Sequence, residues 1–255
     1  MRRLITIIMM LFIFVSCKNN KQGDLKSAFI IDGKLSNASG KQVLLQKLTI
    51  NDLISIDSAV LKNDGAFSFN VKTNEAGIYL LKKDENSYIT IIADKGEHIM
   101  FECDYDKFNK AYSVKGSQGS EQICKLNDHL QKNLLVLDSL GRVWNVAKND
   151  ANRLQIKADI DSCYFRTVRE QREFQLDFIN KNSSSFAAMI ALYIGLDRTQ
   201  IINQEKDFNL FEKVRKDILA KYPANSQAIE LDKRIKQMKM LRVEKNIIDE
   251  RNSKK

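Results

Sequence analysis

Short apolar and alternating runs between residues 28 and 114 predict a β domain. Turn residues interrupt these runs at near-regular intervals, and residues 67–71 alternate strictly between apolar and polar side chains. Such alternation is typical of a strand that has one buried face and one solvated face. About eight short strands without helical patterns between them favour an antiparallel β-sandwich over residues 28–116.

The tripeptide Asn63-Asp64-Gly65 is a good turn signal within this domain. An Asp-Gly pair favours the backbone conformations of a tight β-hairpin loop. An apolar run at residues 54–60 precedes the turn, and the alternating run at residues 67–71 follows it. We therefore expect these two runs to pair as the arms of a hairpin.

The hydrophobic period changes directly after residues 116–120, which contain two glycines and two serines. From Ile123 to Leu137, apolar residues recur at steps of three and four, as on one face of a helix. Ser120 stands where an N-cap is expected. Further stripes of this kind predict an all-helical region over residues 120–250, with roughly four or five helices. The predicted fold class is α+β, with an N-terminal antiparallel β-sandwich followed by this helical region.

Residues 1–16 have the pattern of a lipoprotein signal peptide. Two arginines precede an apolar run at residues 4–15, which is shorter than the roughly 20 residues that span a bilayer. Cys17 follows directly, and its thiol is the nucleophile that lipidation requires. Residues 17–27 are polar and contain glycine, so we expect a flexible tether between the membrane and the β domain.

Composition, with 44% hydrophobic and 29% charged residues, is typical of a soluble globular protein. The formal net charge is +9, but Lys and Arg alternate with Asp and Glu along the predicted helices. Because the sequence has neither a Gly-rich phosphate loop nor an aromatic–basic platform, we expect no nucleic-acid binding. The lipid on Cys17 is the predicted membrane attachment. The predicted location is the cell envelope, anchored in the outer membrane and facing the periplasm, since no acidic cluster follows Cys17.

Candidate metal and redox residues lack the spacing that their chemistry requires. Cys103, Cys124 and Cys163 lie far apart and form no CxxC pair. Free buried thiols and one disulfide with a leftover thiol both remain open. His98 and Cys103 are separated by an odd number of residues, which places them on opposite faces of a regular strand. We therefore expect no metal site.

The candidate calcium-binding and catalytic motifs lack required residues. Asp104 and Asp106 begin like a calcium loop, but Phe108 occupies the next ligand position. Asp138 and Asp161 are expected on solvated helix faces, and no nucleophile elbow is present. We expect no cofactor and no enzymatic activity.

Short motifs connect the chain to a known group of proteins. The motifs are Cys17, Gly33-Lys34-Leu35, Asp64-Gly65-Ala66-Phe67 and, more weakly, Tyr222-Pro223. In these residues the chain resembles envelope lipoproteins of Bacteroidota that carry the N-terminal β domain of unknown function 4369. In many members a TlpA/ResA-type thioredoxin-like domain with a Trp-Cys-x-x-Cys motif follows. The single tryptophan here, Trp144, has no cysteine pair beside it, so we expect a chain without that domain and do not carry over its redox activity.

The resemblance to Bacteroidota envelope lipoproteins also implies an O-glycosylation signal at two serines. Asp57-Ser58-Ala59 and Asp138-Ser139-Leu140 are similar to the three-residue signal for general O-glycosylation in Bacteroidota envelopes. Ser58 and Ser139 are therefore predicted O-glycosylation sites.

The expected function is that of a lipid-anchored, non-catalytic binding or assembly module with an unidentified envelope protein as partner. Two alternatives remain: an accessory to envelope thiol-redox or stress chemistry, and a sandwich that binds a carbohydrate or another small ligand. For the latter, the candidate stacking side chains are Tyr79, Tyr88, Tyr105 and Tyr112.

Replacing Cys17 by Ala removes the predicted acyl acceptor. We expect the Cys17→Ala chain to incorporate no alkyne-palmitate label and to move from the membrane pellet to the soluble fraction, whereas Cys163→Ala keeps both label and location. Crosslinking in the same cells followed by mass spectrometry should recover an envelope partner from the wild type and not from Cys17→Ala. A Cys17→Ala chain that remains labelled and membrane-bound contradicts the lipoprotein interpretation.

Overall fold

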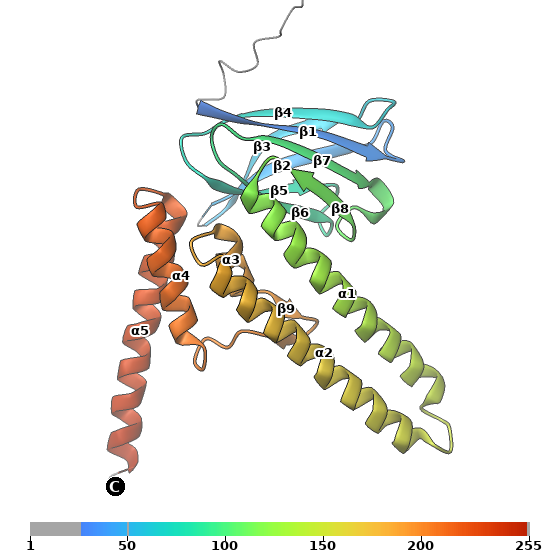
Figure 1. Cartoon of the computed structure of the whole chain (residues 1–255), viewed down its shortest axis with the longest axis vertical. Coiled ribbons are helices and arrows are strands. Elements are labelled where there is room, and N and C mark those ends of the chain that lie inside the picture. The colour runs from blue at the N-terminus through green and yellow to red at the C-terminus, as the bar shows by residue number, and fades with distance from the viewer. Residues whose placement is uncertain (1–26, 50, 254–255) are drawn as a thin grey trace, which may run out of the picture.

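A computed structural model describes residues 27–49 and 51–253 of the chain. Figure 1 shows a β domain at one end, from which the helices extend as two arms. The predicted signal peptide, Cys17 and the predicted tether up to residue 26 lie outside the described residues.

The β domain consists of two four-stranded sheets. The first sheet has the order β4 (Ala66–Lys72), β1 (Ala28–Ser36), β7 (His98–Asp104), β8 (Tyr112–Lys115). The second has the order β3 (Leu53–Val60), β2 (Gln42–Leu48), β5 (Gly77–Lys82), β6 (Tyr88–Ala93). Side chains of both sheets share one buried core, which includes Phe29 and Phe101 from the first sheet and Leu45 and Tyr79 from the second. Together with the helices that follow, this confirms the predicted α+β class.

One neighbouring pair of strands is parallel. β1 and β7 run in the same direction, with Ile30 opposite His98 and Ser36 opposite Asp104. The other neighbouring strands of the two sheets pair antiparallel, as predicted. Alternation reveals which side chains share a face, but it carries no information on strand direction.

The predicted hairpin around Gly65 is wrong. β3 pairs with β2 and β4 pairs with β1, so the turn connects the two sheets instead of two neighbours in one sheet. The turn itself is as expected: Gly65 has φ +74°, and a Cβ there would lie 1.7 Å from the Leu35 carbonyl oxygen. Asp64 Oδ1 accepts a hydrogen bond from the Ala66 amide at 3.1 Å. Local chemistry sets the turn, whereas packing between sheets selects the partner strand.

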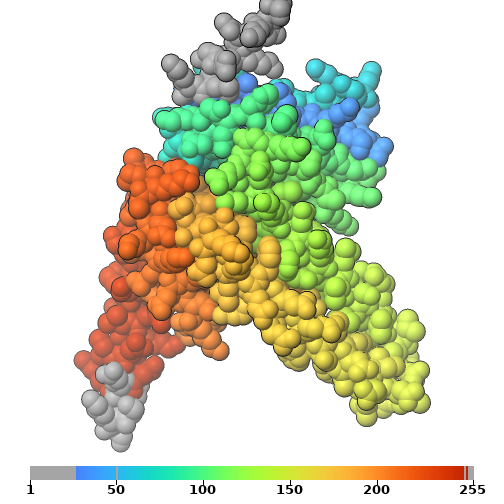
Figure 2. All heavy atoms as spheres, in the orientation of Figure 1, coloured from blue at the N-terminus to red at the C-terminus, as the bar shows by residue number. Residues whose placement is uncertain are grey.

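Within the described residues, five α-helices and a two-stranded ribbon follow the sheets. They are α1 (Gln118–Ala147), α2 (Arg153–Lys181), α3 (Phe186–Ala191), the ribbon β9 (Gly195–Leu196) and β10 (Thr199–Gln200), α4 (Phe208–Lys221) and α5 (Ser226–Ser253). α1 and α2 form one long arm, and α4 with α5 forms the other (Figures 1 and 2). None of the described helices has the length and apolar character that crossing a membrane requires.

The start of α1 is bound to the edge strand β6. The N-cap is Ser117, three residues before the predicted Ser120. The Ser120 hydroxyl instead donates to the Ile92 carbonyl at 2.7 Å and accepts from the Ile92 amide at 3.0 Å. At Gly119 a Cβ would lie 2.6 Å from Ile92 Cγ2, so glycine permits this close approach. The helix thereby covers a sheet edge that is otherwise open to pairing.

The start of α5 is bound to the same sheet at another point. Asn225 is buried, and its Nδ2 donates to the Ala76 carbonyl at 2.7 Å while its Oδ1 accepts from the Gln227 amide at 2.9 Å, which caps the helix. The Ser226 amide and hydroxyl donate to the Glu75 carboxylate at 3.0 and 2.8 Å. Burial raises the pKa of Glu75, but the hydrogen bonds from Ser226 outweigh it and hold this pKa below its usual value.

A second core joins the β domain to the helices. Ile78 of β5 and Ile92 of β6 point away from the sandwich core and pack with side chains of the helical region, among them Ile123, Phe186 and Leu231. The second sheet is therefore buried on both of its faces along β5 and β6.

Asn225→Ala removes both the cap of α5 and its bond to Ala76. Because the Ala76 carbonyl then loses its buried donor, we expect the free energy of unfolding to fall by roughly 2 kcal/mol. Urea denaturation followed by circular dichroism measures the change. Asn246→Ala, at an exposed position of the same helix, should change the free energy of unfolding by less than about 0.5 kcal/mol. Equal unfolding midpoints for the two variants contradict the anchoring role.

Candidate ligand-binding cleft

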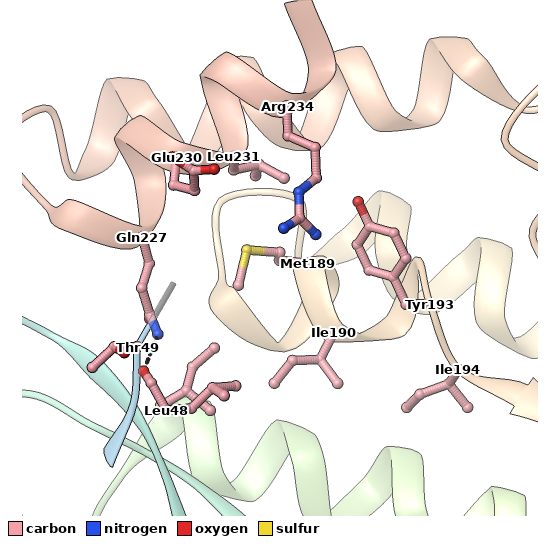
Figure 3. A pocket seen from close by; sticks show the side chains of 11 residues that line it. Leu48, Thr49, Met189, Ile190, Tyr193, Ile194, Gln227, Glu230, Leu231 and Arg234 are labelled. Carbon is pink, nitrogen blue, oxygen red and sulfur yellow. Dashed lines mark hydrogen bonds between the residues drawn. The ribbon is translucent and has the colours of Figure 1, made fainter. Parts of the chain in front are cut away.

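A cleft opens where the second sheet, the segment around α3 and the start of α5 meet (Figure 3). Its volume of about 400 Å³ lies within the range of roughly 300–1,000 Å³ that is typical of small-molecule sites. Six apolar side chains line it: Leu48, Ile78, Met189, Ile190, Ile194 and Leu231. Its polar lining residues are Thr49, Tyr193, Gln227, Glu230 and Arg234.

Helical periodicity brings the α5 residues of the cleft onto one face. Gln227, Leu231 and Arg234 stand at steps of four and three, and Glu230 is four residues before Arg234. Leu231 is buried, whereas Arg234 is exposed. The helix thus lines the cleft from a buried apolar end to a charged mouth.

Gln227 connects this helix to the end of β2. Its Nε2 donates to the Leu48 carbonyl at 2.8 Å, the contact drawn as a dashed line in Figure 3. Its Oε1 is buried and has no hydrogen-bond partner among the described residues. The amide therefore holds two walls of the cleft together.

The wall that follows α3 is held from behind by a chain of buried amides. Gln175 Nε2 donates to the Ile194 carbonyl at 3.0 Å, and Gln171 Nε2 donates to Gln175 Oε1 at 3.2 Å. His129 Nδ1 and Asn133 Nδ2 lie 3.0 and 2.8 Å from Gln171 Oε1. Since that oxygen only accepts, the contact requires the hydrogen on His129 Nδ1. Both glutamines are completely buried, so the network fixes the position of the wall.

The two charged side chains of the cleft, Glu230 and Arg234, lie near its mouth (Figure 3). The Arg234 guanidinium and the Tyr193 hydroxyl point toward one another (Figure 3). Burial raises the pKa of Tyr193, although the charge of Arg234 and a hydrogen bond from it act in the opposite direction. Among the described residues, no carboxylate forms an ion pair with Arg234, and Glu230 has no cationic partner either.

The residues that the sequence singled out lie elsewhere. Ser58 on β3 and Ser139 on α1 are both exposed, as modification requires, and their glycosylation stays a prediction. Asp138 pairs with Arg142, and Asp161 pairs with Lys157 at 2.5 Å, so both aspartates stabilise helix surfaces. Cys17 lies outside the described residues.

The four tyrosines do not form a stacking platform. Tyr79 is buried in the sandwich core with its ring edge-on to Phe29. The ring of Tyr112 tilts against Phe101, and the ring of Tyr105 lies under the Lys83 ammonium. Tyr88 is 48% exposed. Tyr88 and Tyr112 line one pocket, but the ring contacts of the described residues join no two of these four tyrosines, which gives no support to carbohydrate stacking.

The three cysteines of the described residues are free thiols. Burial raises the pKa of Cys103 to about 12 and that of Cys124 to about 11. His98 lies on the opposite face of β7 from Cys103, as predicted, and its Nε2 is 2.7 Å from Asp32 Oδ2. Residues 27–49 and 51–253 contain no group of three or more potential ligands placed to hold a metal ion.

The sequence interpretation did not identify the cleft. One available signal was the composition of β5 and β6, whose apolar residues run almost continuously where those of β4 alternate. A continuous run indicates a strand that is covered on both faces. This signal predicts that the helices pack against the second sheet. It would therefore have indicated the junction at which the cleft forms.

Comparison with known proteins identifies the β domain and nothing further. Residues 29–123 match the family described as Domain of unknown function (DUF4369). The match covers both sheets and the first turns of α1, which agrees with the resemblance noted for the β domain. No curated protein and no solved structure matches the chain.

The raised pKa values make Cys103 and Cys124 poor nucleophiles. At pH 8 a thiol with a pKa of about 12 is ionised to roughly one part in 10⁴. In a chain with Cys17→Ser and Cys163→Ser, we expect Ellman's reagent to react at least 100-fold more slowly in buffer than in urea. In the folded protein, the rate of the reaction with Ellman's reagent should keep rising up to pH 10. A plateau near pH 8.5 in the folded protein contradicts the burial of these thiols.

Proposed function

We propose that the chain is a non-catalytic binding module of the cell envelope, anchored by lipid on Cys17, that holds an apolar ligand between its β domain and its helices. The cleft is the observation that carries this proposal. Six apolar side chains line this concave site, and such a surface binds apolar groups because burial removes both surfaces from water.

Hydrogen bonds hold the walls of the cleft in place, which favours a binding site over a gap left by imperfect packing. Asn225 and Gln227 attach α5 to the second sheet, and Gln175 holds the Ile194 segment from behind. A cleft whose walls are fixed before binding loses little conformational entropy when the ligand enters.

The polar groups of the cleft suit orientation of a ligand better than chemistry on it. Tyr193 has a raised pKa and therefore keeps its proton at neutral pH. Neither Glu230 nor Arg234 stands beside a serine, cysteine or histidine of the cleft lining, so no activated nucleophile is available there.

A second candidate function is docking of an envelope protein on the α1–α2 arm. Its distal part exposes large apolar side chains, with Val146 at 86%, Leu154 at 77% and Phe165 at 67%. Contiguous apolar surface is typical of interaction sites, and these exposed side chains are what supports this candidate. The crosslinking comparison between wild type and Cys17→Ala tests for such a partner; recovery of a thiol oxidoreductase would favour the redox-accessory alternative.

A larger side chain inside the cleft should weaken the binding of an apolar dye. Met189 projects into the cleft, so Met189→Trp should lower the affinity for Nile red, a neutral apolar dye, at least about tenfold. Fluorescence titration measures the affinity, and circular dichroism verifies the fold. Val146→Trp, at the exposed end of α1, should leave dye affinity unchanged. If both variants bind the dye like the wild type, the cleft is not the apolar binding site.

A further inference from the structure

We infer that the ligand of the cleft is an apolar monocarboxylate with an acyl chain, whose carboxylate is bound by Arg234 at the mouth. This inference rests on the proposed function, because it concerns the same cleft. Three features support it: Arg234 has no carboxylate partner among the described residues, Glu230 lies in the same cleft, and most of the wall side chains are apolar.

Among the described residues Arg234 has no carboxylate partner, whereas Arg172 and Arg215 each have one. Arg172 binds Asp207 through two nitrogens at 2.9 and 2.6 Å, and Arg215 binds Asp232 at 2.6 Å. Glu230 stands four residues before Arg234, a spacing at which such pairs commonly form, yet the two do not pair. The guanidinium instead extends over the apolar cleft beside Tyr193 (Figure 3).

The pair of donors at the mouth matches a carboxylate. A guanidinium presents parallel N–H groups that bind both oxygens of one carboxylate, and a protonated tyrosine adds a further donor. The apolar side chains beside them exclude water from part of this contact, which strengthens a charge-assisted hydrogen bond.

Glu230 limits the ligand to a single negative charge. Its carboxylate also lines the cleft, apart from the Arg234 guanidinium (Figure 3). A second anionic group of the ligand would meet this carboxylate without a cation to compensate it. The charges therefore orient a monocarboxylate with its anionic end toward Arg234.

An acyl chain fits the walls better than a peptide does. Six of the lining side chains are apolar and offer neither donor nor acceptor, and the polar atoms between them include the Thr49 hydroxyl and the Gln227 amide. A peptide would bring several N–H and C=O groups against the apolar side chains and leave those without a partner unsatisfied, which is costly. An acyl chain brings none.

Displacement of Nile red from the full mature chain with Cys17→Ser tests the inference. The probes are octanoate, decanoate, methyl decanoate and N-acetyl-leucyl-leucine. We expect decanoate to bind about 15-fold more tightly than octanoate, since each buried methylene contributes about fourfold. Decanoate should also bind at least about tenfold more tightly than its methyl ester, which has the same chain without the charge.

Variants of the mouth separate charge recognition from apolar binding. Arg234→Met should weaken decanoate at least about tenfold and change methyl decanoate less than about twofold, and Tyr193→Phe should weaken decanoate by a few-fold. Arg169→Met, at an exposed arginine of α2, is the matched control and should change neither. Unfolding midpoints verify that each variant is folded.

The outcomes distinguish the two proposals. If Nile red and methyl decanoate bind in the cleft but decanoate gains nothing from Arg234, the carboxylate inference is overturned and the apolar site stands. If N-acetyl-leucyl-leucine binds and decanoate does not, the inference of an acyl-chain ligand is overturned in favour of the C-terminal end of a peptide. If neither dye nor decanoate binds, and Met189→Trp changes nothing, both proposals fall.

Discussion

The second sheet is buried on both faces, and the rest of the molecule depends on this double burial. In β5 and β6, Tyr79 and Ile91 pack into the sandwich core, while Ile78 and Ile92 pack against the helices. A sheet that left one of these faces in water would expose a continuous apolar surface. The helical region is therefore required to cover the sheet, even though it forms no strand of it.

Hydrogen bonds determine where the helices cover the sheet. Ser120 binds the backbone of Ile92 on the edge strand, and Asn225 binds the backbone of Ala76 before β5. Hydrophobic burial is non-directional and would permit the helices to slide, whereas these bonds require one position. The two helical arms start at separate points of the sheet and diverge (Figure 1). Apolar side chains of α3 and α5 therefore remain partly uncovered, and they line the cleft.

Elements whose signal is local were predicted well. The alternation of Phe67, Phe69 and Val71 corresponds to the buried face of β4, and the stripe that begins at Ile123 corresponds to the buried face of α1. The turn at Gly65 was also predicted, but its partner strands were not. The preference of an Asp-Gly turn is encoded in two residues, while the choice between β1 and β3 depends on how two sheets pack.

Hydrophobic periodicity was enough to establish the class of fold and the change from strands to helices near residue 117. The spacing of cysteines and histidines showed no redox or metal motif. The parallel pairing of β1 with β7 and the assembly of the cleft, in contrast, arise from tertiary packing. Its residues come from β2, β5, the α3 segment and α5, and Leu48 and Arg234 are far apart in the chain. Periodicity reports which side chains share a face, but contacts between distant elements arise from packing and from single hydrogen bonds that no short motif records.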